Sequence, residues 1–192
     1  MTTALTPPLL QFGTGRFLQA HVDCFVSQAL DAGEAGQALG GIAVVQSTAS
    51  PASSERLLAL RSGAGYPVHL RGLQQGALVD TTLHCHAVHA AWQAEADWPR
   101  LLGAMAGDVR IIVSNTADQG FVLSPQDDAG LIGHPQRVPI SYPAKLLVLL
   151  HHRWRQQPDA PLSIYPCELV ERNGDVLRDI VGTLARDWQL PA

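Results

Sequence analysis

The hydrophobic positions near the start of the chain change their period at a glycine turn. Leu9 to Phe12 is a short apolar run that stops at Gly13. From Phe17 to Leu30, apolar residues recur at the spacing of one helix face. The continuous apolar run Ile42 to Val45 then has the character of a strand buried on both faces of a parallel sheet. This pattern predicts a β–α–β unit.

Helical and strand patterns continue to alternate along the rest of the chain. Proline and glycine with little periodicity predict a loop over Ser124 to Pro143. The alternation predicts an α/β fold with a mainly parallel, twisted sheet and helices on both faces. The predicted helices are Ser53–Leu60, Asp97–Met105, Ala144–Gln156 and Asp175–Trp188, and the predicted strands are Tyr66–Leu70, Leu78–Val88, Val109–Val113 and Leu162–Tyr165.

Composition limits the number of domains, the possible partners and the cellular compartment of the protein. A chain of 192 residues has the length of one domain, and 46% hydrophobic with 16% charged residues is typical of a globular protein. The net charge is −4 and lysine and arginine do not cluster, which disfavours nucleic acid as a partner. We expect no export signal and no membrane span, because no basic leader and no run of about 18 apolar residues is present. Three widely spaced cysteines indicate a reducing compartment, so we expect a cytoplasmic protein.

The glycine turn is the first candidate binding site. It lies between a strand and a helix, where dinucleotide-binding folds hold a pyrophosphate against backbone N–H groups. The pattern departs from G-x-G-x-x-G because Leu18 occupies the third glycine position. From the residues alone, a nucleotide-binding loop and a simple glycine turn are equally supported. The residues predicted to contact the cofactor here are Gly13, Thr14, Gly15, Arg16 and Phe17.

Two further strand ends carry polar candidates. The second strand ends at Gln46, where NAD-binding folds usually place a carboxylate against the adenosine ribose. An amide can still bind a diol, so we expect NAD rather than NADP, although the missing charge removes a barrier to a 2′-phosphate. Asn115 and Thr116 follow a central strand, at the edge where open α/β sheets bind ligands. We predict that they contact the nicotinamide ribose; the alternative is a turn that only ends the strand.

Five blocks of this sequence resemble, in order, those of the mannitol dehydrogenase family, the polyol-specific long-chain dehydrogenases. Within the last block, Cys-Glu-Leu followed by Asn-Gly resembles the tagaturonate and fructuronate reductases, which are altronate and mannonate oxidoreductases. The resemblance implies that residues 1–192 form the N-terminal, Rossmann-like NAD-binding domain, incomplete at its C-terminal end and without the family's C-terminal helical catalytic domain. The blocks are Leu10–His21, Val68–Gly72, Ser114–Gly120, Pro143–Leu146 and Pro166–Gly174.

The resemblance also implies a reaction. Hydride passes between a nicotinamide and the carbon that carries a hydroxyl of a polyol or sugar acid, and a lysine of the absent domain exchanges the hydroxyl proton without zinc. Lys145 matches a different block and is not expected to be that lysine. The mannitol enzymes carry an Asp-Asn pair where this chain has Glu168 and Leu169. Glu168 and Asn173 are therefore the candidates to replace the asparagine that holds the reacting oxygen, unless this oxygen is polarised from elsewhere.

Several residues have simpler interpretations. His84, Cys85, His86 and His89 suggest metal ligands, but a fourth ligand at a zinc spacing is missing and edge-strand histidines are the favoured interpretation. His21 either lines the cofactor cleft or packs on the helix surface.

At the level of the whole molecule, two alternatives remain beside the oxidoreductase domain. One is a stand-alone dinucleotide-binding or regulatory module, and the other is a domain that self-associates through a face left uncovered.

Overall fold

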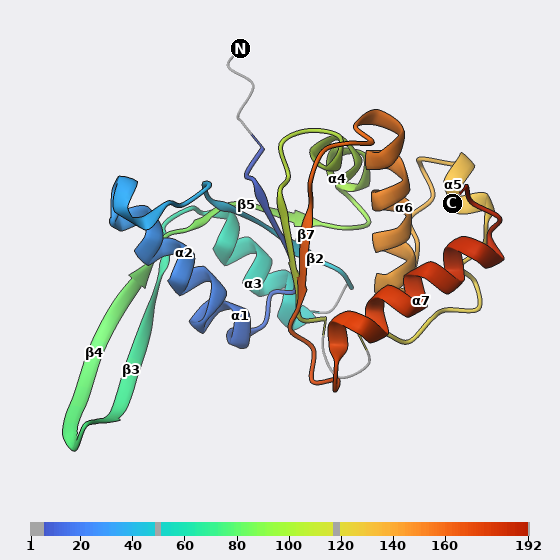
Figure 1. Ribbon diagram of the computed structural model, residues 1–192. Coiled ribbons are helices and arrows are strands. Elements are labelled where there is room, and N and C mark those ends of the chain that lie inside the picture. The colour runs from blue at the N-terminus through green and yellow to red at the C-terminus, as the bar shows by residue number, and fades with distance from the viewer. Residues whose placement is uncertain (1–5, 49–50, 117–119, 192) are drawn as a thin grey trace, which may run out of the picture.

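The computed structural model describes residues 6–48, 51–116 and 120–191, and it is built around one parallel sheet (Figure 1). The five strands lie in the order β5-β2-β1-β6-β7, and every neighbouring pair runs parallel. The direction of strand order reverses beside β1, which is where open α/β sheets bind ligands. The strands are β1 (Leu9–Phe12), β2 (Ile42–Gln46), β5 (Val88–Gln93), β6 (Ile111–Ser114) and β7 (Ser163–Pro166).

Helices cover both faces of the sheet, as the alternating pattern predicts. On one face α2 (Val22–Asp31) and α3 (Pro51–Arg61) pack against residues such as Ile42 and Val44. On the other face α4 (Trp98–Met105) and α6 (Tyr142–Gln156) bury Phe12 and Ile112, among others, and α7 (Asn173–Asp187) packs against α6. The predicted fold class is confirmed. Among these ranges, no helix is long and apolar enough to cross a bilayer.

A two-stranded antiparallel ribbon, β3 (Tyr66–Gln74) and β4 (Ala77–Cys85), projects from the body of the molecule (Figure 1). The single strand predicted over Leu78–Val88 is wrong, because the chain leaves the ribbon at Cys85 and enters the parallel sheet as β5. Ser27 of α2 fixes this change of direction by accepting hydrogen bonds from the backbone N–H groups of residues 86 and 87, both at 3.0 Å. The free thiols of Cys24 and Cys85 lie 2.7 Å apart at the same junction.

The other differences concern helix and strand ends. The single helix predicted over Phe17–Leu30 is two, α1 (Arg16–Ala20) and α2, because the backbone bends at His21, whose Nδ1 lies 2.8 Å from the Phe17 carbonyl oxygen. A short helical segment, η1 (Gly33–Gly36), follows α2. The predicted loop over Ser124–Pro143 contains the short helix α5 (Gly130–Gly133). Helix α6 begins at Tyr142 rather than Ala144, because Ser141 caps it. The strand predicted from Val109 begins at Ile111.

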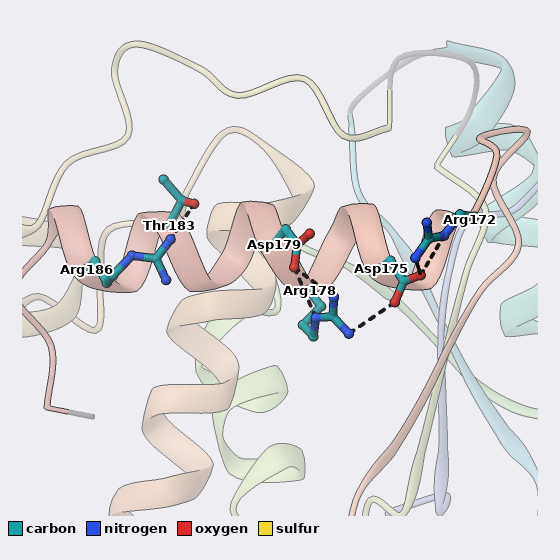
Figure 2. A network of polar contacts seen from close by, with 6 residues as sticks. All are labelled: Arg172, Asp175, Arg178, Asp179, Thr183 and Arg186. Atoms are coloured by element: carbon teal, nitrogen blue, oxygen red, sulfur yellow. Dashed lines mark hydrogen bonds and ion pairs between the residues drawn. The ribbon is translucent and has the colours of Figure 1, made fainter.

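Helix α7 turns a charged face toward solvent (Figure 2). Asp175 forms ion pairs with Arg172 at 2.7 Å and with Arg178 at 3.1 Å, and Arg186 donates to the Thr183 hydroxyl at 2.9 Å. Exposed ion pairs of this kind add little stability. They keep this face polar, so the face is unsuited to the apolar self-association considered above.

Candidate functional site

The loop after β1 passes between the ends of β2 and β6. Gly13 has a φ of +124°, and a Cβ atom there would lie 2.4 Å from the carbonyl oxygen of Asn115. Its N–H donates to the Val45 carbonyl at 3.0 Å. Gly15 differs, because a Cβ on it would meet no atom within 4 Å. Gly13 is therefore required for the approach of the two strand ends, whereas Gly15 faces open space.

A pocket of about 170 Å³ lies over this loop. It joins the glycine loop to the polar residues at the ends of β2 and β6, so most of the predicted cofactor contacts meet there. Arg16 and Phe17 do not line it; both are exposed on α1, and Phe17 stacks on His21 with ring centroids 4.6 Å apart. The lining residues are Gly13, Thr14, Gly15, Gln46, Ser47, Thr48, Ser53, Arg56, Asn115 and Thr116.

Gln46 lines the pocket at the end of β2. Its side chain is only 2% exposed, and its Nε2 donates to the Thr48 carbonyl at 2.9 Å and to the Ser54 hydroxyl at 3.3 Å. The Oε1 atom is buried and has no hydrogen-bond partner, and the same holds for Oγ of Ser47. Because buried polar atoms are nearly always paired, these two atoms mark a place for a polar ligand.

Arg56 is a pocket residue that the sequence did not suggest. It comes from α3, and its Nε lies 3.5 Å from the Thr14 hydroxyl while its Nη2 lies 3.4 Å from the Ser53 hydroxyl. A single arginine in a predicted helix does not, from its neighbours in sequence, indicate a binding residue. Only the packing of α3 beside the sheet brings it to the glycine loop.

The residues after β6 and β7 are bonded to one another. The buried carboxylate of Glu168 accepts hydrogen bonds from the Ser114 hydroxyl and from the N–H and hydroxyl of Thr116, each at 3.1 Å. Asn115 Nδ2 donates to the Cys167 carbonyl at 2.7 Å. Asn173 Nδ2 donates to the carbonyls of Pro166 and Glu168, at 2.8 and 3.1 Å. Glu168 and Asn173 thus hold the carboxyl edge of the sheet in shape, and neither lines the pocket.

A second, larger pocket of about 620 Å³ adjoins the first and shares Ser47, Thr48 and Thr116 with it. Its wall includes the exposed apolar side chains of Val122 and Ile140. The two pockets form a continuous depression along the carboxyl edge, polar over the glycine loop and more apolar beyond β6.

The remaining candidate residues lie elsewhere. Lys145 is 3% exposed at the start of α6, and its Nζ donates to the Ile140 carbonyl at 2.5 Å. Burial lowers the pKa of Lys145 to about 8 against the opposing effect of Asp127. His86 leaves the ribbon and lies 3.4 Å from Asp31. The described residues contain no group of three or more histidines, cysteines or acids placed to bind a metal ion.

Comparison with known proteins gives the relatives of this chain. No protein-family model matches it. The altronate oxidoreductase of Halalkalibacterium halodurans is 28% identical over 195 residues, which cover 99% of this chain and 36% of that protein. The altronate oxidoreductase of Klebsiella pneumoniae strain 342 is 32% identical over 188 residues, which cover 95% of this chain and 37% of that protein. The chain resembles altronate oxidoreductases. It spans little more than a third of the length of these relatives, and the resemblance predicted from the sequence blocks is confirmed.

Solved structures show the same fold. A D-sorbitol dehydrogenase in substrate-free form superimposes with a TM-score of 0.75 at 20% identity, covering 95% of this chain and 38% of that one. The mannitol 2-dehydrogenase of Pseudomonas fluorescens was solved as a ternary complex with NAD and D-mannitol. It superimposes with a TM-score of 0.73 at 19% identity, covering 94% of this chain and 37% of that one. At this level of identity the likeness concerns the fold, which is the Rossmann-type arrangement described above.

Proposed function

We propose that the chain is the cofactor-binding domain of an NAD-dependent oxidoreductase that interconverts a polyol or aldonate hydroxyl and a ketose or keto-uronate carbonyl, of the mannitol, altronate or mannonate type. One observation carries the proposal. In a chain similar to altronate oxidoreductases, the predicted contact residues of three separate segments, apart from Arg16 and Phe17, converge on one pocket at the switch point of the sheet. Bound NAD supplies a hydride acceptor there.

The residues of the pocket fit the parts of a dinucleotide. The open space where a Cβ of Gly15 would lie, in the loop after β1, suits a pyrophosphate bound by backbone N–H groups. The unpaired Oε1 of Gln46 suits a ribose hydroxyl, which donates a hydrogen bond. The apolar wall at Val122 and Ile140, beyond β6, suits the nicotinamide ring. Asn115 and Thr116, held by the residues after β7, lie on the side proposed for the nicotinamide ribose.

The substrate side is proposed to come from the part of the relatives that this chain does not match. Tyr165 on the edge strand β7 and Leu169 beyond it are 56% and 94% exposed, which suits contact with further protein or, in its absence, with a second copy. The free state of all three cysteines supports the proposed cytoplasmic location. The second candidate, a dinucleotide-binding module without catalysis, is favoured by one observation: among the described lining residues, none can accept a proton from a substrate.

The test is a substitution at Gly15. A Cβ atom there meets no protein atom within 4 Å, so Gly15→Val should fold normally. Its branched side chain fills the space proposed for the pyrophosphate and blocks close backbone approach to the ligand, so NADH affinity should fall by at least about 100-fold. Calorimetric titration measures affinity, and circular dichroism checks the fold. Gly103→Val on α4 is the matched control, because a Cβ there also meets no atom within 4 Å. Unchanged affinity in folded Gly15→Val would show that the loop is only a turn.

A further inference from the structure

The described residues that line the pocket over the glycine loop include a cation and no anion. Arg56 lines it, whereas none of the described lining residues is an aspartate or glutamate. Enzymes selective for NAD usually place a carboxylate at the end of the second strand, where it binds the ribose diol and repels a 2′-phosphate. Gln46 holds that position here and is uncharged. The electrostatic basis for excluding a phosphate is therefore missing from this part of the pocket.

Among the described residues, none neutralises the charge of Arg56. Its two hydrogen bonds, at 3.5 and 3.4 Å, are long and go to the neutral hydroxyls of Thr14 and Ser53, and no ion pair to it is found among the described residues. Arg61, on the same helix, pairs with Asp97 at 3.1 Å and also donates to the Ala91 carbonyl at 2.9 Å. Arg61 therefore serves the fold, whereas Arg56 keeps most of its five donors for another partner.

A second, independent feature lines the same pocket as this cation. The Ser47 hydroxyl directly after β2 is buried without a hydrogen-bond partner, and so is Oε1 of the preceding residue, Gln46; both residues line the pocket. A hydroxyl can donate to a phosphate oxygen, and an amide oxygen accepts from a ribose hydroxyl. A guanidinium matches phosphate oxygens in a bidentate manner. The adenosine side of the pocket thus offers a cation, a hydroxyl donor and an acceptor.

On the basis of the dinucleotide-binding function proposed above, we propose that Arg56 and Ser47 bind a phosphate on the 2′-oxygen of the adenosine ribose, so that the chain binds NADP at least as tightly as NAD. Arg56 is the specificity-determining residue, and Gln46 is left to accept from the neighbouring 3′-hydroxyl. This preference differs from the NAD dependence proposed above and expected from the sequence. The sequence shows that the carboxylate is missing, but it does not show that α3 brings an arginine to the same pocket.

The experiment titrates the 192-residue chain with NADPH and with NADH, followed by cofactor fluorescence. Wild-type protein should bind NADPH at least as tightly as NADH. Arg56→Ala should weaken NADPH by about 10- to 100-fold, the usual range for a lost hydrogen bond to a charged group, and NADH by less than about threefold. Arg186→Ala removes the same charge on α7, away from the pocket, and should change neither affinity.

Three outcomes would overturn the inference. Tenfold tighter binding of NADH than of NADPH by the wild type would show that the pocket rejects the phosphate. Equal weakening of both cofactors in Arg56→Ala would assign the arginine to the pyrophosphate, which both cofactors share. Binding of neither cofactor by the folded chain would remove the proposed function itself, and with it this inference, and is distinguishable from the first two results.

Discussion

Asp23 is a carboxylic acid enclosed between α2 and the base of the ribbon. It is fully buried, its Oδ2 accepts a hydrogen bond from the Tyr66 hydroxyl at 2.5 Å, and its Oδ1 has no partner. Burial raises the pKa of Asp23 to about 6 from an ordinary 3.8, although the bond from Tyr66 acts in the opposite direction. The charged form of Asp23 is therefore unfavourable for folding.

This environment predicts a pH-dependent stability. Because the pKa is higher in the folded than in the unfolded state, the folded chain binds more protons between about pH 4 and 6, and the contribution of Asp23 falls as pH rises through this window, by up to about 3 kcal/mol. Asp23→Asn keeps an acceptor for Tyr66 without the charge. It should be more stable than the wild type at pH 7.5, and this advantage should shrink at pH 4.5 in urea unfolding experiments. The exposed Asp108→Asn is the control; parallel pH profiles for wild type and Asp23→Asn would contradict the argument.

Some residues of the pocket could be predicted from their neighbours in sequence, and others could not. Gly13, Thr14 and Gly15 could be predicted because a strand, a glycine turn and a helix follow one another directly in sequence. The same pattern predicts Arg16 and Phe17, but both are exposed on α1 and neither lines the pocket. Arg56 could not be predicted, since its contact with Thr14 joins residues 42 positions apart.

At the scale of elements, local periodicity predicted every strand of the parallel sheet except β5. Apolar and polar residues alternate from the ribbon into the sheet, so nothing in the local pattern separates β4 from β5. The break between β4 and β5 is fixed by Ser27 of α2. Its hydroxyl accepts hydrogen bonds from the two residues after β4, which lie about 60 positions away in sequence. Long-range hydrogen bonds of this kind do not change the pattern of apolar and polar residues in either strand, so the sequence does not reveal them.

Helix α6 is connected to α4 by a buried arginine. Arg153 is 3% exposed; it donates to the Met105 carbonyl at 2.9 Å and to the Pro161 carbonyl at 3.1 Å. Met105 is the last residue of α4, where carbonyl groups lack partners within the helix and where positive charge is favourable. Arg153 thus completes the end of α4 and fixes the turn after α6.

Replacement of this arginine should destabilise the fold. Arg153→Met retains the length of the side chain but leaves two carbonyls without their donors, which should cost about 2 to 4 kcal/mol of unfolding free energy. Arg155→Met, at an exposed position in the last turn of the same helix, should change stability by less than about 0.5 kcal/mol. Urea denaturation measures both. An equal loss in the two variants would mean that Arg153 contributes only its charge near the helix end.

At the scale of the whole molecule, the proposed cofactor pocket lies apart from the candidate proton acceptors. The described residues that line the pocket include one ionisable side chain, Arg56, which does not lose its proton in proteins. The carboxylate of Glu168 accepts three hydrogen bonds at the edge of the sheet. Lys145 donates to the Ile140 carbonyl and is not part of the pocket lining. None of these groups is placed to take a proton from a substrate hydroxyl.

The 192-residue chain alone should therefore bind cofactor without oxidising a polyol or sugar acid. Hydride transfer needs a proton acceptor within about 3 Å of the hydroxyl and a site that excludes water, and a general base alone contributes roughly 10²- to 10⁴-fold. Loss of substrate positioning removes more. Altronate, mannonate or mannitol with NAD or NADP should give no reduced cofactor above background, in samples whose cofactor binding is verified by titration. Turnover above about 1 s⁻¹ would contradict this prediction. Lys145→Ala and Glu168→Gln would then show which of the two supplies the base, because loss of turnover without loss of cofactor binding identifies it.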